Sequence, residues 1–203
     1  MKLVSAFSLF LVLNVCLGQS TGFQRIEIHP TESPISIKNF KIYHTYLVDD
    51  YTYLIGEYQF IAKKYGLIMM VLNKHNSKIF ESAFGGDQYY LTPYFFRSEN
   101  NMDDILILLA SGAEECWGTT VYRFKNEKIE RLGYINLCAV IDGDFVDLPA
   151  YSKITTSGDE ILITFEIEQV YFQEDNQEQF INGNEIKYMY SNNTWKRILK
   201  NSN

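Results

Sequence analysis

The stretch "VYRFKNEKIERL", residues 121–132, decides the fold class because it has the pattern of a β-hairpin. Apolar and polar residues alternate on both sides of Asn126 and Glu127, as expected for two antiparallel strands joined by a tight turn. Two other stretches share this organisation, "VLNKHNSKIFES" at 71–82 and "KYMYSNNTWKRI" at 187–198. The chain is therefore predicted to contain three similar hairpins, each with Asn in its turn.

Further apolar runs precede each hairpin and extend the repeat. Directly upstream lie "YLIGEYQFI", "DDILILLAS" and "EILITFEI", and upstream again "FKIYHTYLV", "YYLTPYFFR" and "VDLPAYSKI". We predict a single all-β domain at 35–200, made of three tandem four-stranded antiparallel meanders near 37–84, 88–140 and 145–200 and closed like a propeller or a sandwich. "ILILLA" is apolar at every position, which indicates an inner strand covered on both faces. "QEDNQEQFINGN" is polar and predicts a loop or a single turn.

The first residues have the pattern of a secretory signal. "MKLVSAFSLFLVLNVCLGQS" places a lysine before an apolar run that is too short for a membrane span and that ends in small residues. We predict cleavage after Gly18, so that 1–18 is the signal and 19–34 an extended segment before the domain. The alternative is a lipid anchor at Cys16. The predicted location is secreted or periplasmic, with no later transmembrane span.

The charge balance of the chain bears on which partners it can bind. The 203 residues include 18 Lys and Arg against 25 Asp and Glu, for a net charge of −7. Removal of the signal removes Lys2, which leaves 17 minus 25, or −8. Nucleic-acid binding requires clusters of Lys and Arg, and this acidic chain argues against it. A protein, peptide or glycan partner stays open, as does a homodimer that would complete a ring of strands.

Part of the chain resembles the blades of FG-GAP and VCBS propeller repeats. The resemblance rests on "DDILILLASG" followed by "TTVYRFKNEKIERLGYI", and the Phe-Gly pair occurs at Phe84-Gly85. It implies four-stranded blades arranged around an axis. The calcium loop of those families, Asp-x-Asp-x-Asp-Gly, does not occur, and "DGDFVD" at 142–147 places three aspartates at a different spacing.

Cys116 and Cys138 are predicted to form a disulfide across the second hairpin. A two-residue turn at Asn126 and Glu127 would leave the cysteines one residue out of register, and either a bulge near Gly133 or a three-residue loop would correct this. An exported protein with two cysteines on facing strands favours a disulfide. A catalytic thiol would need a nearby His, and two cysteines without a His pattern match no standard zinc site.

If the strands that carry the two cysteines continue to pair outward, carboxylates gather at the open end of the hairpin. Glu115 would then face Ala139, Glu114 would face Val140, and Asp142 would face Gly112. The predicted acidic rim consists of Glu114, Glu115, Asp142, Asp144 and Asp147, with Trp117 beside it. Three interpretations are open: a solvated rim with Trp117 packed inward, a docking face for a basic partner, and a weak Ca²⁺ site at Asp142, Asp144 and Asp147.

No motif for catalysis or cofactor binding occurs, and we expect no cofactor. The sequence favours a non-enzymatic binding module over the alternative, a carboxylate-based hydrolase of envelope or extracellular polysaccharide, which would need two convergent carboxyl groups. Aromatic runs such as "QYYLTPYFF" could stack on sugars, although their alternation favours a role in the core. Asn192 lies in an Asn-Asn-Thr sequon, which matters only in a eukaryotic host.

Overall fold

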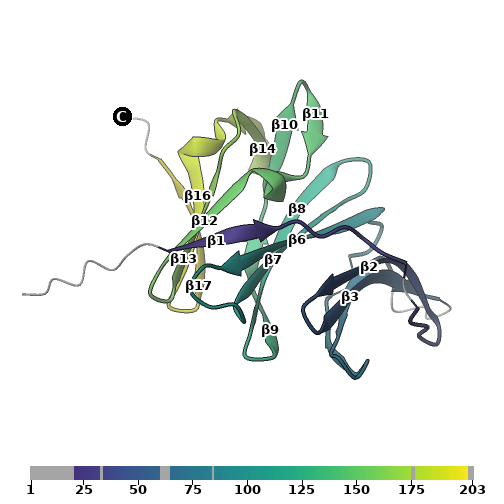
Figure 1. Ribbon diagram of the computed structural model, residues 1–203. Helices are drawn as coiled ribbons and strands as arrows, with labels where there is room; N and C mark the ends of the chain where they lie inside the picture. The colour runs from purple at the N-terminus through teal and green to yellow at the C-terminus, as the bar shows by residue number, and fades with distance from the viewer. Residues whose placement is uncertain (1–20, 33, 60–64, 84, 175–176, 201–203) are drawn as a thin grey trace, which may run out of the picture.

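The computed structural model consists of three antiparallel β-sheets (Figure 1). It describes residues 21–32, 34–59, 65–83, 85–174 and 177–200, and the predicted signal with Cys16 lies outside these ranges. The predicted all-β class is confirmed, since the described ranges contain no α-helix. They do contain two short 3-10 turns, η1 (Leu148–Tyr151) and η2 (Gly183–Glu185). No helix in these ranges has the length and apolar character needed to cross a bilayer.

The described residues form seventeen strands. They are β1 (Thr21–Ile26), β2 (Phe40–Val48), β3 (Tyr51–Tyr58), β4 (Ile68–Leu72), β5 (Lys78–Glu81), β6 (Tyr90–Ser98), β7 (Ile105–Gly112), β8 (Cys116–Lys125), β9 (Lys128–Ile135), β10 (Cys138–Ile141), β11 (Asp144–Val146), β12 (Ser152–Ser157), β13 (Glu160–Phe165), β14 (Gln169–Glu174), β15 (Gln177–Ile181), β16 (Ile186–Ser191) and β17 (Thr194–Leu199).

Meanders build two of the three sheets. The first meander, β2-β3-β4-β5, is a sheet of its own. The second, β6-β7-β8-β9, supplies four strands of a nine-stranded sheet with the order β17-β16-β13-β12-β1-β6-β7-β8-β9. The third, β12-β13-β16-β17, is interrupted by the β14–β15 hairpin, which joins β10 and β11 in a sheet of order β11-β10-β14-β15. The prediction of a loop or single turn at 173–184 is therefore wrong, since the described part of this stretch contains the end of β14 and all of β15, whose side chains are exposed or half-buried.

The segment expected to precede the domain supplies one of its central strands. β1 lies between β12 and β6, with Phe23 opposite both Ile154 and Ser98. Phe23 is buried in the core. The folded domain therefore begins before residue 35, because β1 joins the second meander to the third.

Strand β7 separates two hydrophobic cores, which confirms the prediction of an inner strand. Leu106 and Leu108 point into the core shared with the third meander and the β11-β10-β14-β15 sheet. The alternate side chains, Ile105, Ile107 and Leu109, pack against the first meander. Since successive side chains of a strand point to opposite faces, the continuous apolar run is explained by burial on both sides.

The hairpin turns agree with the sequence pattern. Lys125 pairs with Lys128 across a two-residue turn in which Asn126 and Glu127 both have positive φ. This conformation matches the twist of the flanking strands. The register then shifts between Val121 and Tyr122, so that Val121 faces Gly133. The bulge predicted near Gly133 is therefore present.

The nine-stranded sheet nearly closes on itself. The indole Nε1 of Trp195 on β17 donates to the carbonyl oxygen of Tyr134 on β9 over 2.9 Å. A Cβ atom at Gly133 would lie 2.3 Å from the Trp195 ring, so the close approach of the two edge strands requires glycine at this position.

Candidate functional site

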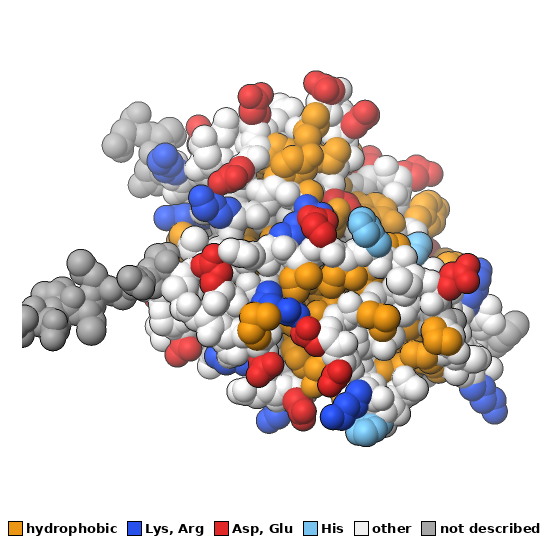
Figure 2. Space-filling model, viewed as in Figure 1, with side chains coloured by type: hydrophobic (Ala, Val, Ile, Leu, Met, Phe, Trp, Pro, Cys, Tyr) orange, Lys and Arg blue, Asp and Glu red, His pale blue; other side chains and the backbone are white. Residues whose placement is uncertain are grey.

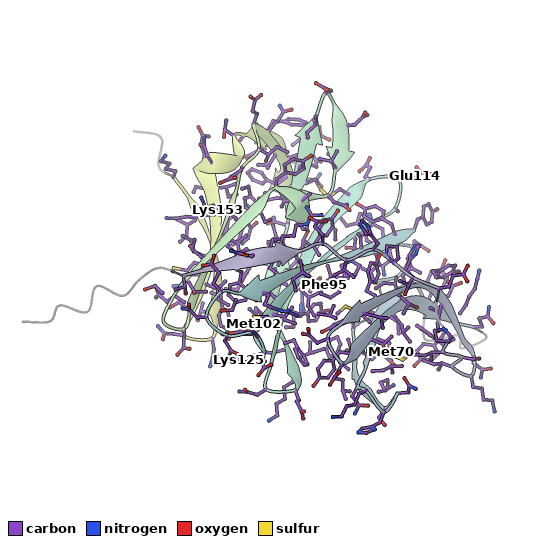
Figure 3. The ribbon with its side chains drawn as sticks, viewed as in Figure 1. Met70, Phe95, Met102, Glu114, Lys125 and Lys153 are labelled. Atoms are coloured by element: carbon purple, nitrogen blue, oxygen red, sulfur yellow. A yellow bond between two sulfur atoms is a disulfide. The ribbon has the colours of Figure 1, made fainter. Side chains whose placement is uncertain are left out.

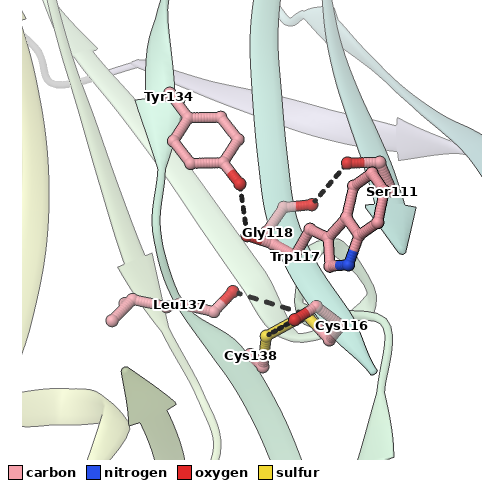
Figure 4. The surroundings of a disulfide bond; sticks show 7 residues. All are labelled: Ser111, Cys116, Trp117, Gly118, Tyr134, Leu137 and Cys138. Atoms are coloured by element: carbon pink, nitrogen blue, oxygen red, sulfur yellow. Dashed lines mark hydrogen bonds between the residues drawn. A yellow bond between two sulfur atoms is a disulfide. The ribbon is translucent and has the colours of Figure 1, made fainter. Parts of the chain in front are cut away.

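The predicted disulfide between Cys116 and Cys138 is present (Figure 4). Their Cα atoms are 5.9 Å apart, within the range that a disulfide spans. Each sulfur is bonded to the other, so neither acts as a nucleophile or a zinc ligand in this state. Next to the bond, Gly118 has a φ of 124°, and a Cβ there would lie 2.4 Å from the carbonyl oxygen of Ile135. Glycine is therefore needed where β8 bends beside the disulfide.

The predicted continuation of the β8 pairing beyond the cysteines is wrong. The ladder between β8 and β9 ends at Thr119 opposite Ile135. The chain then leaves β9, and Ala139 pairs instead with Val146 of β11 and Val170 of β14. Leu137 is fully buried at this crossing, and its burial in the core favours the departure from the ladder. Glu115 and Glu114 therefore do not face Ala139 and Val140, and Asp142 does not face Gly112.

The five carboxylates of the predicted rim do not form one group. Glu114 and Glu115 lie at the turn between β7 and β8, where Figure 3 labels Glu114. Asp142 and Asp144 flank the tip of the β10–β11 hairpin, and all four are exposed. No group of three or more His, Cys, Asp or Glu residues in the described ranges could hold a metal ion. The calcium interpretation at Asp142, Asp144 and Asp147 therefore has no geometric support.

Asp147 turns away from the rim and into a cluster of tyrosines. Its Oδ2 accepts a hydrogen bond of 2.8 Å from the hydroxyl of Tyr94. Burial raises the pKa of Asp147, and the hydrogen bond from Tyr94 opposes part of this rise. Burial and the nearby Asp147 also raise the pKa of Tyr90 to about 12. Asp147 is thus a half-buried carboxyl group that contacts Tyr94, unlike the exposed carboxylates of the predicted rim.

The interpretation that Trp117 packs inward is wrong. It is the extra residue of a bulge in β8, because Ser111 pairs with Gly118 while Gly112 pairs with Cys116. Its ring is 40% exposed and borders a groove with Phe80, Arg131 and other side chains of β5, β8 and β9. A bulge re-aims a side chain, and this one directs Trp117 outward.

An aromatic row that the sequence reading missed lies beside Glu115. Phe145 of β11 and Tyr171 of β14 have ring centroids 5.4 Å apart, and Tyr171 lies 5.3 Å from Phe180 of β15. Phe145 is 43% exposed and Phe180 52% exposed. Figure 2 shows hydrophobic side chains at the upper end of the molecule, where Figure 1 places β10, β11 and β14, with acidic side chains around them.

The row occupies the outer face of its sheet. The alternate residues Val170 and Phe172 are buried in the core on the inner face. Tyr171, between them, must point the other way. The alternation in "QVYFQE" was the signal that could have revealed this face, but the polar residues around it favoured a loop.

Two carboxylates act on Tyr171 at this face. Burial raises the pKa of the Tyr171 hydroxyl, and the negative charges of Glu178 and Glu115 raise it further. No described Lys or Arg forms an ion pair with Glu114, Glu115, Glu178, Asp142 or Asp144. We call Phe145, Tyr171, Phe180, Glu115 and Glu178 the aromatic–acidic face.

Two carboxylates near the opposite turns of β6 to β9, unlike those of the aromatic–acidic face, form ion pairs with Arg or Lys. Asp104 is buried and receives two hydrogen bonds from the guanidinium of Arg123, at 2.8 and 2.5 Å. The ammonium of Lys125, labelled in Figure 3, lies 3.6 Å from the same carboxylate. Asp49 pairs with Arg97 at 2.6 Å. The chain thus supplies cations to Asp104 and Asp49, whereas the aromatic–acidic face receives none from the described residues.

Comparison with known proteins finds no matching family, no matching curated protein and no matching solved structure.

Proposed function

We propose that this protein is an exported, non-enzymatic binding module that docks a basic protein segment on its aromatic–acidic face. The observation that carries the proposal is the combination of an exposed aromatic row with carboxylates that no described cation neutralises. Exposed aromatic rings together with uncompensated charge are typical of docking surfaces.

The chemistry of the face favours Arg or Lys on the partner. A guanidinium can stack on the ring of Tyr171 or Phe180 and at the same time pair with Glu115 or Glu178. The net charge of −7 attracts a basic partner over longer range and speeds its encounter. The same charge disfavours nucleic acid.

An oxidising compartment fits this role. The disulfide and the lack of a membrane-spanning helix in the described ranges are consistent with an extracellular or periplasmic location. The signal at 1–18 would deliver the chain there. Asn192 lies at the exposed turn between β16 and β17, where a glycan could attach in a eukaryotic host.

The hydrolase alternative has less support. Its chemistry needs a protonated carboxyl group and a second carboxylate a few ångströms away. Asp147 has the raised pKa of such an acid, but its pKa is set by burial and by Tyr94, with no contribution from another carboxylate. Asp147 could therefore act as the acid, but no carboxylate near it contributes to its pKa as the required second group would.

The direct test is a titration of the whole protein with a short peptide of alternating Arg and Gly, followed by NMR. We expect shifts centred on β11, β14 and β15 and an affinity that falls as salt is added. Replacing Tyr171 and Phe180 by Ala should weaken binding by about tenfold or more, since aromatic anchors dominate such contacts. Replacing Glu115 and Glu178 by Gln should weaken peptide binding and make the affinity less dependent on salt concentration.

Two controls separate docking from general attraction to an acidic protein. Glu32→Gln removes one exposed carboxylate outside the face and should leave the affinity nearly unchanged. A peptide of alternating Glu and Gly should not bind. Equal binding of both peptides, or an equal loss in Glu32→Gln and in the Glu115 and Glu178 variant, would refute the proposal.

A further inference from the structure

A hollow lined by tyrosines lies between the first meander and the start of β6, and it shares no residue with the aromatic–acidic face. Its volume is about 380 Å³. That is within the size range of small-molecule pockets. The side chains that matter for its chemistry are Tyr43, Tyr46, Tyr89, Tyr90, His44 and Glu57.

A bulge in β2 builds one wall of the hollow. The register shifts between Ile42 and His44, so that Tyr43 is the extra residue. Neighbouring residues of a regular strand point to opposite faces, yet Tyr43 and His44 both line the hollow. Gly56 faces Ile42 at this point, and a Cβ there would lie 2.2 Å from the carbonyl oxygen of Lys41. Glycine thus permits the close approach of β3 to the bulge.

The ring of Tyr43 is held in place although it is exposed. Its hydroxyl donates a hydrogen bond to Glu57. The ammonium of Lys41 lies 4.4 Å from the ring centroid. A ring that is already fixed loses little conformational freedom when a ligand stacks on it, which favours binding.

A buried aromatic side chain lines part of the hollow. Tyr46 is buried, and its ring lies 6.0 Å from that of Phe95, which Figure 3 labels. Tyr89 is 72% exposed at the rim, next to Tyr90. The wall therefore offers apolar ring faces together with hydroxyl, imidazole and carboxylate groups.

We propose that this hollow binds a neutral saccharide through stacking on Tyr43 and Tyr89. A pyranose ring has an apolar face of C–H groups and an edge of hydroxyls, and tyrosine combines an apolar ring with a polar end in the same way. His44, Glu57 and the tyrosine hydroxyls can pair with the sugar hydroxyls. A quaternary ammonium ion, which aromatic cages also bind, is disfavoured because the Lys41 cation already contacts the Tyr43 ring.

The test uses isothermal titration of the whole protein with maltohexaose, cellohexaose, chitohexaose and choline as separate probes. At least one of the oligosaccharides should bind. Tyr89→Ala should weaken this binding by about tenfold or more. Tyr89 is largely exposed, so the variant should keep the melting temperature of the parent. Tyr43→Phe keeps the ring and should retain more affinity than Tyr43→Ala. Phe180→Ala is the matched control on the other surface and should bind saccharide as the parent does.

Three results would overturn the inference. The first is that none of the oligosaccharides binds. The second is that binding persists unchanged in both Tyr89→Ala and Tyr43→Ala, which would place the sugar elsewhere. The third is that choline binds and the oligosaccharides do not, which would identify a cation site. The hollow shares no residue with the aromatic–acidic face, which contains Phe180. A negative result with oligosaccharides would therefore not affect the proposed binding of a basic peptide, which has its own titration.

Discussion

The two smaller sheets cover opposite faces of β7 but differ in what covers them. The first meander, β2 to β5, buries its outer face under its own chain: Leu54, Ile68 and Met70 form a third core with Ile35 and Ile37. The β11-β10-β14-β15 sheet buries its inner face in the core shared with β7, but its outer face carries the exposed Phe145 and Phe180 and the half-buried Tyr171.

The two sheets therefore differ in whether the chain itself covers the outer face. The first meander is contiguous in sequence, so its strands pair locally and the segment before β2 can fold over it. The other sheet combines two hairpins that are separated in sequence by β12 and β13, and the disulfide joins its inner strand β10 to β8. Its exposed aromatic row has no role in its own core.

The largest expected effect comes from a substitution in the covered outer face of the first meander. Met70 is 2% exposed and lies in the third core, where Figure 3 labels it. Met70→Ala should lower the free energy of unfolding by between about 3 and 5 kcal/mol, since truncation leaves a cavity. Phe180→Ala removes a larger side chain from the uncovered face and should cost below about 1 kcal/mol. Urea unfolding of both variants measures the contrast, and equal losses would show that the two outer faces are equally packed.

Next in size is the loss of the disulfide. Replacing Cys116 and Cys138 by Ala should lower the free energy of unfolding by about 3 kcal/mol, because the closed loop no longer restricts the unfolded chain. Hydrogen exchange should speed up locally at the amides of β10 and β14, while β3 and β4 change only with global stability. An equal rise of the exchange rates in all three sheets would mean that the disulfide does not stabilise the β11-β10-β14-β15 sheet in particular.

Much of the fold was predictable because local patterns determine it. The turn at Asn126 and Glu127, the run at 105–110 and the bulge near Gly133 each follow from neighbouring residues. The role of β1 was not predictable, since its partners β6 and β12 lie far away in sequence. The pairing of β10 with β14 depends on burial of Leu137 and Val170, which no local pattern encodes.

The candidate site was predicted less well. Glu114 and Glu115 were expected to face β10 at the open end of the disulfide-bonded hairpin, but β10 pairs elsewhere, and the aromatic row comes from β11, β14 and β15. Asp147 was expected with Asp142 and Asp144 because of its spacing, yet its neighbours are tyrosines of β6. The resemblance to FG-GAP and VCBS blades and the homodimer stay predictions.

The smallest expected effect concerns Asp147, which contrasts with the exposed carboxylates of the aromatic–acidic face. Burial raises the pKa of Asp147 in the folded protein above the value of about 4 in the unfolded chain. The folded state therefore binds this proton more tightly than the unfolded state does. The resulting stabilisation is present below the unfolded pKa and is lost as pH rises through the folded pKa.

Asp147→Asn should remove this dependence, because the amide oxygen still accepts a hydrogen bond from Tyr94 and no proton is released. Above the folded pKa, the variant should be at least as stable as the parent, and the difference should shrink or reverse as pH falls towards 4. Asp142→Asn is the matched control, since Asp142 is exposed, and it should follow the parent at every pH. Thermal melts across this range provide the measurement. A parent and an Asp147→Asn variant with parallel pH profiles would show that Asp147 is as well solvated as the carboxylates of the surface.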